Sequence, residues 1–493
     1  MKKVLPREKT QTTLDEIISI MQNTQKKRQA LSQIPLERKL EVINELGKLW
    51  SSPDYSRRKL LIEFCAEQTG YSKEMVKMEL SFVPIMLNPE SLLNHFNQLP
   101  GGPKSIDRNI WVNKGECFRN LPKGNIFVVG AGNSFAPHLL TTLISLLTNN
   151  FVILRPSQSN CIALEEFKES FTELESEYSS TARIMSEAFE VVYTGHDSPA
   201  FDYLLKEAEI NVFNFWGGKR ALDAILEKIN VRSALDRPSF VINGPMVGMA
   251  VIQEGSDNLE TIARGLAYDI ALFDQKLCSS PVEAQFVGSE EVFYQFAQLV
   301  GETLEIFRFT LPQRELDSAT IRNTHIARKT LQRSGAKVIM PKDHAADWTV
   351  IASEKNPNLD VAVEAIGKTP HGTYLFNAHA RPRLIEIVRV DSIDEALNAV
   401  RNLNIRRQYK DVMRVQSLGY SVKNSLEFIK KTSEIGVFRS LPIGEMNART
   451  LLEPMDGINL AIEFTRTHYS RRSSKVVKSV LVPQRLEDNV QFS

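Results

Sequence analysis

The period of the hydrophobic positions changes along the chain, and each period predicts a different kind of element. Between residues 35 and 95, apolar residues recur every three or four positions, as in the segments ERKLEVINELGKLW and RRKLLIEFCAEQ. That spacing places apolar side chains on one face of a helix. We therefore expect residues 1–100 to form a helical N-terminal region.

From residue 124 to residue 242, short apolar runs alternate with amphipathic runs. The apolar runs NIFVVGA, NFVILRPS, FEVVYTG and INVFNFWGG are separated by segments such as HLLTTLISLL and CIALEEFKESFTEL. This alternation of strands and helices is typical of a parallel sheet with helices on both faces. Such sheets bind ligands at the carboxyl ends of their strands, so residues 101–245 are expected to form a ligand-binding α/β domain.

A second alternating stretch begins near Met249 and predicts a second α/β domain over residues 246–435, with a return segment and tail at 436–493. The tail contains several basic residues before and within the extended segment VVKSVLV: Arg466, Arg471, Arg472, Lys475 and Lys478. It is either a strand for oligomerisation or docking, or a solvated charged face. The expected fold class is α/β, with two doubly wound Rossmann-like domains between the helical region and the tail.

Composition excludes several classes of protein. The 493 residues are 42% hydrophobic and 24% charged, which is ordinary for a globular protein of two or three domains. A net charge of +1 creates no strong positive potential that would attract nucleic acid, so no nucleic-acid partner is expected. The most apolar stretch is interrupted by Thr148, Asn149 and Asn150 and predicts no membrane span. No apolar run follows the basic N-terminus, so we expect no signal peptide and a cytoplasmic protein.

The chain has four cysteines, Cys65, Cys117, Cys161 and Cys278, which are far apart and form no CxxC pair. No histidine cluster has zinc spacing, so no metal site is expected. Cys278 follows an apolar run in FDQKLCSSP, at a junction that can expose its side chain. A thiolate there is a candidate nucleophile, although an inert buried cysteine fits the local sequence equally well.

The order of four segments resembles the aldehyde dehydrogenase superfamily. GAGNSFAPHLLTTLISLLTNNFVILRPSQ is similar to the stretch in which an asparagine opens a helix and a later strand ends in a basic residue, proline and serine. VVYTG, VFNFWGG and DQKLC then follow in the places of the next strand, the phosphate turn and the nucleophile motif. The resemblance is strongest to the acyl-CoA reductase family, including the fatty-acid reductases of bacterial bioluminescence operons. It is carried by SRRKLLIEFCAEQTGYSKEMVKMEL, WVNKGECFRNLPKG, FWGGKRA, YDIALFDQKLC and PMDG.

The resemblance implies that a cysteine thiolate attacks an acyl thioester and that the enzyme-bound acyl group is then reduced to an aldehyde. Cys278 matches the nucleophile. Asn133 matches the side-chain donor to the acyl oxyanion, with the Cys278 N–H as the second donor. The other interpretation of Asn133 is a helix N-cap before residues 134–140.

The resemblance also implies a nicotinamide cofactor across the first sheet. Gly217 and Gly218 follow a strand and precede KRALDAILEKI, where glycine allows the backbone to approach a phosphate, although a tight turn alone needs glycine. Gly195 and Trp216 are further candidate contacts, and simple packing is the other interpretation of Trp216.

The cofactor is expected to be NADPH, with NADH possible. Arg155 matches the position that reaches the adenosine ribose and is followed by Pro156 and Ser157. No carboxylate occurs between Arg155 and Leu164, and a guanidinium suits a 2′-phosphate. A surface ion pair is the alternative for Arg155.

One departure favours acyl reduction over aldehyde oxidation. Hydrolytic aldehyde dehydrogenases carry a water-activating glutamate in a Glu-Leu-Gly-Gly segment, whereas the corresponding stretch here, VRSALDRPSFVI, contains only Asp236, which does not align with that base. Several other polar residues are interpreted as core or surface residues, and no proton donor is assigned: His138, His196, His371 and Glu116.

The sequence leaves three functions open. They are an acyl-CoA or acyl-carrier-protein reductase, an oxidative aldehyde dehydrogenase, and a non-catalytic subunit that channels acyl groups. The resemblance further implies a homo-oligomer and, in bioluminescence systems, a complex with an acyl-protein synthetase and a thioesterase. The sequence does not specify acyl chain length.

Overall fold

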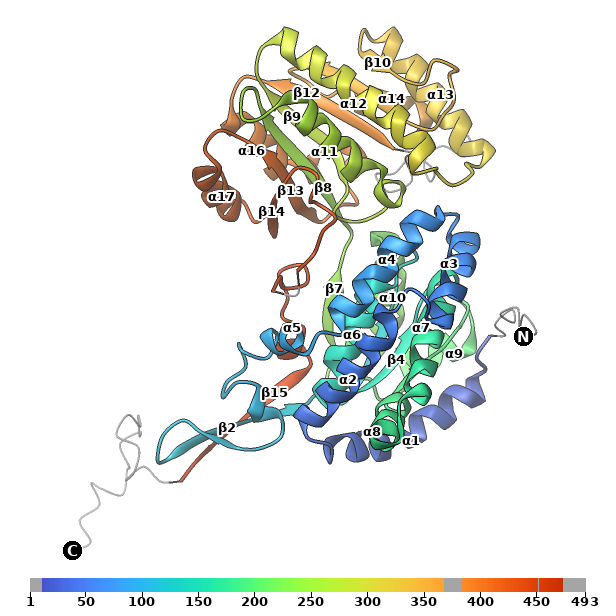
Figure 1. The fold of residues 1–493 in the computed structure, drawn as a ribbon, viewed down its shortest axis with the longest axis vertical. Helices are drawn as coiled ribbons and strands as arrows, with labels where there is room; N and C mark the ends of the chain where they lie inside the picture. The colour runs from blue at the N-terminus through green and yellow to red at the C-terminus, as the bar shows by residue number, and fades with distance from the viewer. Residues whose placement is uncertain (1–10, 368–380, 382, 451, 473–493) are drawn as a thin grey trace, which may run out of the picture.

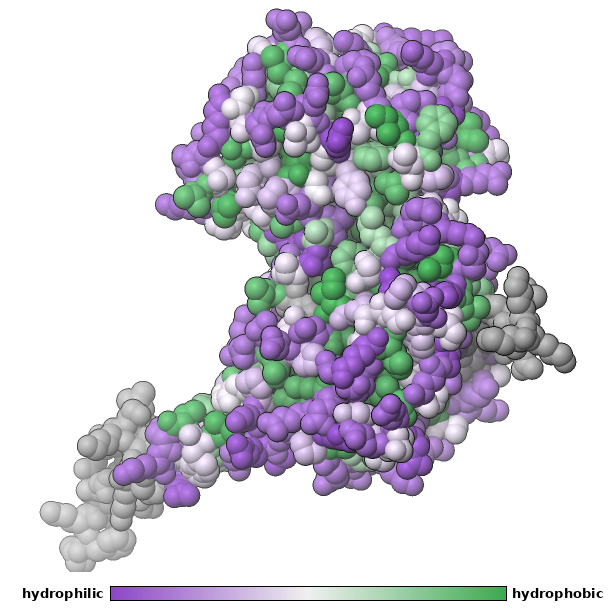
Figure 2. All heavy atoms as spheres, in the orientation of Figure 1, coloured by the Kyte–Doolittle hydropathy of each residue, from purple (hydrophilic) through white to green (hydrophobic). Residues whose placement is uncertain are grey.

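The computed structural model describes residues 11–472, apart from 368–380, 382 and 451, and arranges them as two lobes with a projecting arm (Figure 1). The first lobe contains the N-terminal helices and a sheet formed within residues 125–243. The second lobe contains a sheet formed within residues 246–442. Figure 2 shows that the surface is indented between the two lobes.

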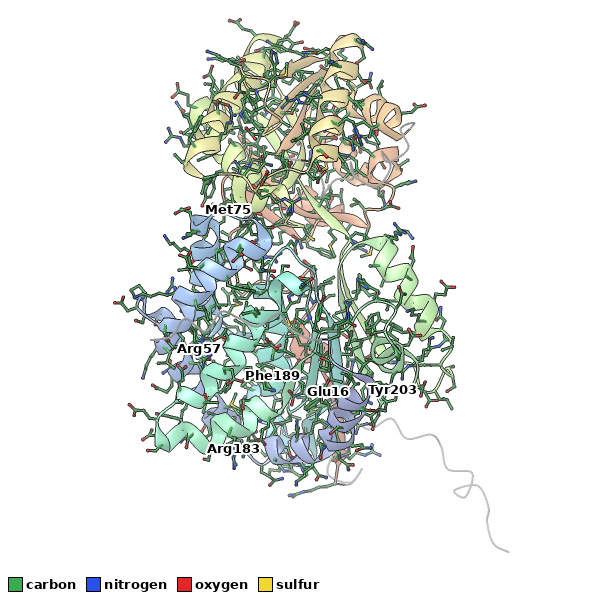
Figure 3. The ribbon with its side chains drawn as sticks, turned by 90° about the vertical axis from the view of Figure 1, so that its right-hand side faces the viewer. Glu16, Arg57, Met75, Arg183, Phe189 and Tyr203 are labelled. Carbon is green, nitrogen blue, oxygen red and sulfur yellow. The ribbon has the colours of Figure 1, made fainter. Side chains whose placement is uncertain are left out.

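The N-terminal region is helical, as the three-to-four spacing predicts. Its helices are α1 (Leu14–Ser32), α2 (Leu36–Ser51), α3 (Ser56–Thr69), α4 (Lys73–Met86) and α5 (Pro89–Asn94). The stripe Leu40, Ile43, Leu46 and Trp50 of α2 is buried. Both α2 and α4 contact α6 of the first sheet layer, so these helices complete the first lobe. Figure 3 shows Met75 of α4 at the boundary between the lobes.

The sheet of the first lobe is parallel and has the strand order β5-β4-β3-β6-β7. Its strands are β3 (Asn125–Val129), β4 (Phe151–Arg155), β5 (Phe189–Val191), β6 (Val212–Trp216) and β7 (Ser239–Asn243). Its helices are α6 (Ala136–Leu147), α7 (Gln158–Ser170), α8 (Ser176–Glu187), α9 (Pro199–Lys206) and α10 (Lys219–Ile229). Strand order reverses between β3 and β6, and ligands bind beside the carboxyl ends at such a point.

The sheet of the second lobe has the order β10-β11-β12-β9-β8-β13-β14, and only β10 is antiparallel to its neighbour. Its strands are β8 (Met246–Gln253), β9 (Pro281–Val287), β10 (Lys337–Ile339), β11 (Thr349–Glu354), β12 (Leu384–Val390), β13 (Arg414–Ser421) and β14 (Arg439–Pro442). Its helices are α11 (Leu259–Ala271), α12 (Glu290–Thr310), α13 (Ser318–Arg333), α14 (Leu359–Gly367), α16 (Ile393–Arg401) and α17 (Ser425–Glu434). The sheet continues past residue 435 because β14 pairs with β13.

The arm is an antiparallel sheet of β1 (Ile110–Trp111), β2 (Glu116–Pro122) and β15 (Thr465–Arg471). Thus β2 pairs with β1 on one side and with β15 on the other, and these strands are not part of the first sheet. The chain returns to the first lobe through α18 (Leu460–Glu463), which contacts α6. The segment VVKSVLV, with Lys475 and Lys478, lies outside the described residues.

These parallel sheets with flanking helices confirm the predicted α/β fold class. Within the described ranges, no helix combines the length and the apolar character needed to cross a membrane.

Candidate active site

A cavity of about 430 Å³ lies between the lobes and brings together both predicted catalytic residues and three of the predicted cofactor contacts. Cys278, Asn133, Trp216, Gly217 and Gly218 all line it. The first lobe contributes the carboxyl ends of β3 and β6, and the second lobe contributes the loop before β9. The two halves of the predicted site therefore meet at the switch point of the first sheet.

The Asn133 side chain connects the two lobes. Its Nδ2 donates a hydrogen bond of 2.8 Å to the main-chain oxygen of Lys276, two residues before Cys278. Helix α6 begins at Ala136, and its N-cap, Phe135, makes no side-chain capping bond. Asn133 is therefore not the helix cap, and its amide faces the loop that carries the candidate nucleophile.

Two residues of the N-terminal region hold the turn around Asn133. The Tyr71 hydroxyl donates to the Asn133 carbonyl at 3.2 Å. Glu79 Oε1 accepts from Ser134 Oγ at 2.6 Å and from the Phe135 N–H at 2.7 Å. Burial raises the pKa of Glu79. The helical region thus contributes directly to the site.

The sequence interpretation missed Tyr71 and Glu79, although a signal for Glu79 exists. It occupies the buried stripe of α4, between Met75 and Val83, where an apolar residue is normal. A carboxylate in such a stripe needs a polar partner. The turn before α6 supplies that partner.

His138 contacts the backbone just before this turn and is a core residue, as expected for a lone histidine. Its Nε2 accepts a 3.1 Å hydrogen bond from the Ala131 N–H, which requires the neutral ring. Burial lowers the pKa of His138 to about 4, so the ring stays neutral. A Cβ at Gly130 would lie 2.8 Å from Nε2, so the ring packs where only glycine fits.

The loop between α11 and Cys278 is strained. Phe273, Asp274 and Gln275, in the short helix η3 (Leu272–Gln275), have φ values of 50°, 51° and 61°. The left-handed conformation costs a non-glycine residue about 1–2 kcal/mol. The loop then leads through Cys278 into β9.

Cys278 is partly exposed and lines the cavity, whereas Cys65, Cys117 and Cys161 are buried. Burial, with a smaller effect of the Asp456 carboxylate, raises the pKa of Cys278 to about 11. A hydrogen bond from the Met246 backbone and the charge of Arg449 act in the opposite direction. The thiol is therefore protonated at neutral pH in the free protein.

A polar network supports Trp216 and Asp456 behind the cavity. Trp216 Nε1 donates to Asn214 Oδ1 at 2.6 Å, and Asn214 Nδ2 donates to Asn243 Oδ1 at 2.9 Å. Asn243 Nδ2 in turn donates to Asp456 Oδ2 at 3.0 Å. The network fixes the Trp216 ring. It also gives Asp456, the aspartate of the PMDG segment, a structural role that the sequence interpretation did not assign.

A second groove, of about 670 Å³, adjoins the cavity at Gly218. Its lining includes His196 and the basic residues Lys219, Arg220 and Lys228. Gly218 is the N-cap of α10. A ligand phosphate in the groove would meet the amide groups of this helix N-terminus.

The two glycines of the turn differ in their surroundings. A Cβ at Gly217 would lie 2.8 Å from the Phe215 ring, whereas a Cβ at Gly218 would have no atom within 4 Å. Gly217 is needed for packing, and Gly218 leaves open space beside the helix terminus. Gly195 lies near the Gln11 side chain, which a Cβ would approach to 3.6 Å.

Arg155 is placed differently from the sequence expectation. Its Nε and NH2 donate to the Thr194 carbonyl at 3.1 and 2.7 Å, and its guanidinium lies 4.5 Å from the Phe201 ring centre. The side chain is buried, so the surface ion pair is not formed. Arg155, Pro156 and Ser157 are absent from the described linings of both cavities. Ser157 is instead the N-cap of α7.

The remaining candidates lie elsewhere. Asp236 is exposed, accepts a hydrogen bond from Ser233 and does not line the cavity. Glu116 is in the arm and accepts from the Tyr469 hydroxyl at 2.7 Å. His371 lies outside the described residues.

Comparison with known proteins gives both a family and a fold. The family model described as acyl-CoA reductase (LuxC) matches residues 31–467. A long-chain acyl-protein thioester reductase of Vibrio harveyi is 29% identical over 311 residues, covering 62% of this chain and 61% of the relative. One of Photorhabdus luminescens is 24% identical over 332 residues, covering 67% and 65%. The match thus spans less than two thirds of each of these relatives.

Solved structures show the same fold at low identity. The glyceraldehyde-3-phosphate dehydrogenase GapN of Methanocaldococcus jannaschii, complexed with NADP, has a TM-score of 0.70 at 10% identity, covering 94% of this chain and 96% of that one. Lactaldehyde dehydrogenase of Escherichia coli has a TM-score of 0.66 at 11% identity, covering 94% and 92%. These likenesses confirm the aldehyde dehydrogenase fold.

Proposed function

The chain belongs to the LuxC family of acyl-CoA reductases, and on that premise we propose that it reduces an acyl thioester to an aldehyde through a thioester on Cys278. One observation carries the proposal. Asn133 from the first lobe donates to Lys276, beside the cysteine that lines the inter-lobe cavity. An oxyanion donor and a nucleophile therefore meet in one pocket, as acyl transfer requires.

In the proposed reaction, the Cys278 thiol loses its proton to water, and the resulting thiolate attacks the acyl carbonyl carbon. The bond from that carbon to the carrier sulfur breaks, and the carrier thiolate leaves and takes a proton. Asn133 Nδ2 and the Cys278 N–H stabilise the negative charge on the acyl oxygen, each by a few kcal/mol. When bound, a nicotinamide would supply the hydride that reduces the acyl group. The carbon–sulfur bond to Cys278 would then break and release the aldehyde, and the Cys278 sulfur would take a proton from water to restore the thiol.

The groove beside Gly218 fits a nicotinamide dinucleotide. Its backbone is open at Gly218, and the N-terminus of α10 supplies amide groups for a phosphate. Lys219, Arg220 and Lys228 line the groove together with Asp197 and Asp411. The basic groups could pair with the extra phosphate of NADPH, which supports NADPH over NADH. Arg155 adds charge from behind the Phe201 ring without lining the groove.

The cavity wall supports an aliphatic acyl group as the substrate. Helix α4 contributes Phe82, Ile85 and Met86, and α6 contributes Pro137 and Leu140. Burying methylene groups against such a wall stabilises a bound chain by about 0.8 kcal/mol each. A long-chain acyl thioester, carried by coenzyme A or by a protein thiol, is the proposed substrate. The long-chain acyl-protein thioester reductases among the relatives agree with this choice.

The carboxylates of the cavity support reduction over hydrolysis. Among the described lining residues, these are Glu79 and Glu453. Glu79 holds the Ser134 turn, and Glu453 accepts from Arg439 at 2.7 Å. Both are engaged, and Asp236 does not line the cavity, so the thioacyl group is protected from an activated water.

The test compares the wild type with Cys278→Ala and with Cys161→Ala, a buried cysteine of the same chain. Loss of NADPH absorbance is followed with octanoyl- and myristoyl-CoA, and the aldehyde is trapped. We expect thioester-dependent oxidation that Cys278→Ala abolishes and Cys161→Ala retains. Turnover that persists in Cys278→Ala would exclude the covalent route. No turnover with either CoA thioester, in protein shown to be folded, would favour an acyl-carrier-protein donor or the non-catalytic acyl-channelling subunit.

Assembly and location are also proposals. We infer a homo-oligomer that uses the arm of β2 and β15, because this antiparallel sheet projects from the first lobe (Figure 1). An acyl-protein synthetase and a thioesterase are the proposed partners, and the cytoplasm is the proposed location. Size measurement of the wild type and of a variant with a shortened arm tests the first of these.

A further inference from the structure

The loop before Cys278 has a backbone that its own sequence does not favour. Phe273, Asp274 and Gln275 are consecutive, none is glycine, and all have positive φ. Left-handed residues other than glycine normally occur singly. A run of such residues persists only where surrounding contacts impose it.

The first such contact is a buried ion pair. Asp274 Oδ1 accepts from Arg383 Nε at 3.2 Å and from Arg383 NH2 at 2.9 Å. The two side chains are 2% and 1% exposed. Arg383 NH2 also donates to the Leu311 carbonyl at 2.7 Å, and the Arg314 N–H donates to Asp274 Oδ2 at 3.3 Å. Both carboxylate oxygens of Asp274 and the Nε and Nη2 atoms of Arg383 therefore have hydrogen-bond partners within the protein.

The second contact is made by the Gln275 amide. Its Nε2 donates to the carbonyl oxygens of Pro281 and Leu384 at 2.7 and 2.8 Å. Its Oε1 accepts from the Leu384 N–H at 2.7 Å. The side chain thus bridges the start of β9 and the start of β12. Both residues of the Asp-Gln dipeptide are therefore anchored to β12, which begins next to Arg383.

The loop is also fixed on its other side. Lys276, which follows the left-handed run, accepts the hydrogen bond of Asn133. Asp274, Gln275 and Arg383 do not line the described cavity, whereas Lys276 and Cys278 do. The ion pair therefore acts on the cavity through the backbone of this loop and through the Asp274 charge, which raises the pKa of the lining residue Lys276 against the effect of burial.

We propose that the buried Asp274–Arg383 pair is a positioning device that holds the left-handed loop, so that the Cys278 thiol and the Asn133 amide address the same acyl carbonyl. The inference rests on the proposed acyl transfer to Cys278. It adds two positioning residues that touch neither the substrate nor the cofactor.

Stability alone does not distinguish this role, because breaking any buried ion pair destabilises a protein. Asp274→Asn removes the charge but keeps the size, and asparagine tolerates the left-handed conformation better than most residues. Glu283→Gln is the matched control. Glu283 is fully buried in β9 and pairs with Arg406, which lies outside the loop of residues 272–280.

The experiment compares two reactions of Cys278 in folded protein, each followed by mass spectrometry. Acylation by myristoyl-CoA needs the oxyanion donors, whereas alkylation by iodoacetamide does not. We expect Asp274→Asn to slow acylation about tenfold or more while alkylation changes by less than about twofold. Glu283→Gln should leave both rates near the wild type. Arg383→Lys, which keeps the charge, should retain more acylation than Arg383→Met.

Amide hydrogen exchange of residues 272–280 gives a readout that does not depend on activity. Exchange should be faster in Asp274→Asn than in the wild type or Glu283→Gln. Equal exchange in all three proteins, or a parallel loss of acylation and alkylation in Asp274→Asn, would overturn the inference. If the wild type is alkylated but no thioester acylates it, the proposed function fails, and the exchange result alone decides the positioning role.

Discussion

The side-chain Nδ2 of Asn133 lies 2.8 Å from the main-chain oxygen of Lys276, so the first lobe directly contacts the loop that carries the candidate nucleophile of the second. One N–H of the amide is used in this bond, and the other is available to a ligand. The same contact orients the donor and limits movement between the lobes at the cavity.

Replacing Asn133 should therefore impair the chemical step. We expect Asn133→Ala to lower kcat for thioester reduction by about 10²–10³, the usual effect of losing one oxyanion donor. KM should change less, because the charge develops after binding. Asn97→Ala, at an exposed position, is the control. Equal losses in kcat and in binding affinity would indicate a role in substrate binding instead.

The pKa of Cys278 predicts a steep pH dependence of its reactivity. Because burial raises this pKa to about 11, the thiolate fraction rises with pH throughout the neutral range. Alkylation by iodoacetamide should increase about tenfold per pH unit from about pH 7 to about pH 10. Asp456→Asn removes a negative charge that raises the pKa, so its profile should shift to lower pH. A plateau already near neutral pH would contradict this picture.

Much of the fold was predictable because it depends on local patterns. The alternating apolar and amphipathic runs specify two parallel sheets. The carboxyl ends of parallel strands lie at one edge of their sheet, which is why Asn133 and Gly218 line the same cavity. The family resemblance, which is confirmed, predicted that Cys278 lies near that edge, because the DQKLC segment follows the strand and turn segments in the same order as in the family.

Other features depend on contacts that no local pattern encodes. Asp274 pairs with Arg383, which is 109 residues away, so its role is invisible in FDQKLC alone. Arg155 ends β4 as expected, but its guanidinium turns toward the Thr194 carbonyl and the Phe201 ring. The sequence pattern therefore predicted that Arg155 ends β4, but it did not predict the direction in which the Arg155 side chain points.

Glu79 should make the stability of the protein depend on pH. Its folded pKa is raised above the usual 4.5, so the folded state holds the proton longer than the unfolded state. The wild type therefore loses stability as pH rises from the unfolded pKa through the folded pKa. Glu79→Gln lacks this group but keeps an acceptor for Ser134 and Phe135. Its melting temperature relative to the wild type should rise with pH across that window.

Glu74→Gln, at an exposed position of the same helix, is the control for the Glu79 prediction and should follow the wild type at every pH. Parallel curves for Glu79→Gln and the wild type would show that the carboxyl has similar pKa values in both states.

Ile85 should influence the length of the acyl chain. It lines the cavity from α4 and is 49% exposed, so a larger side chain there does not disturb the core. Ile85→Trp should lower kcat/KM for myristoyl-CoA by about fourfold for each methylene it displaces, with less effect on octanoyl-CoA. Leu426→Trp, at an exposed position of α17, is the control. Equal effects on both substrates would place the chain elsewhere.

The two glycines after β6 allow packing and cofactor binding to be separated. A Cβ at Gly217 would lie 2.8 Å from the Phe215 ring, so Gly217→Ala should lower the melting temperature. A Cβ at Gly218 meets no atom within 4 Å, so Gly218→Ala should fold normally.

The added methyl group of Gly218→Ala would nevertheless occupy the space beside the α10 N-terminus where a phosphate is proposed to bind. We expect NADPH affinity, measured by fluorescence titration, to fall about tenfold in Gly218→Ala, since that requires the loss of only about 1.4 kcal/mol. Unchanged affinity in a folded Gly218→Ala would move the cofactor phosphates away from this helix.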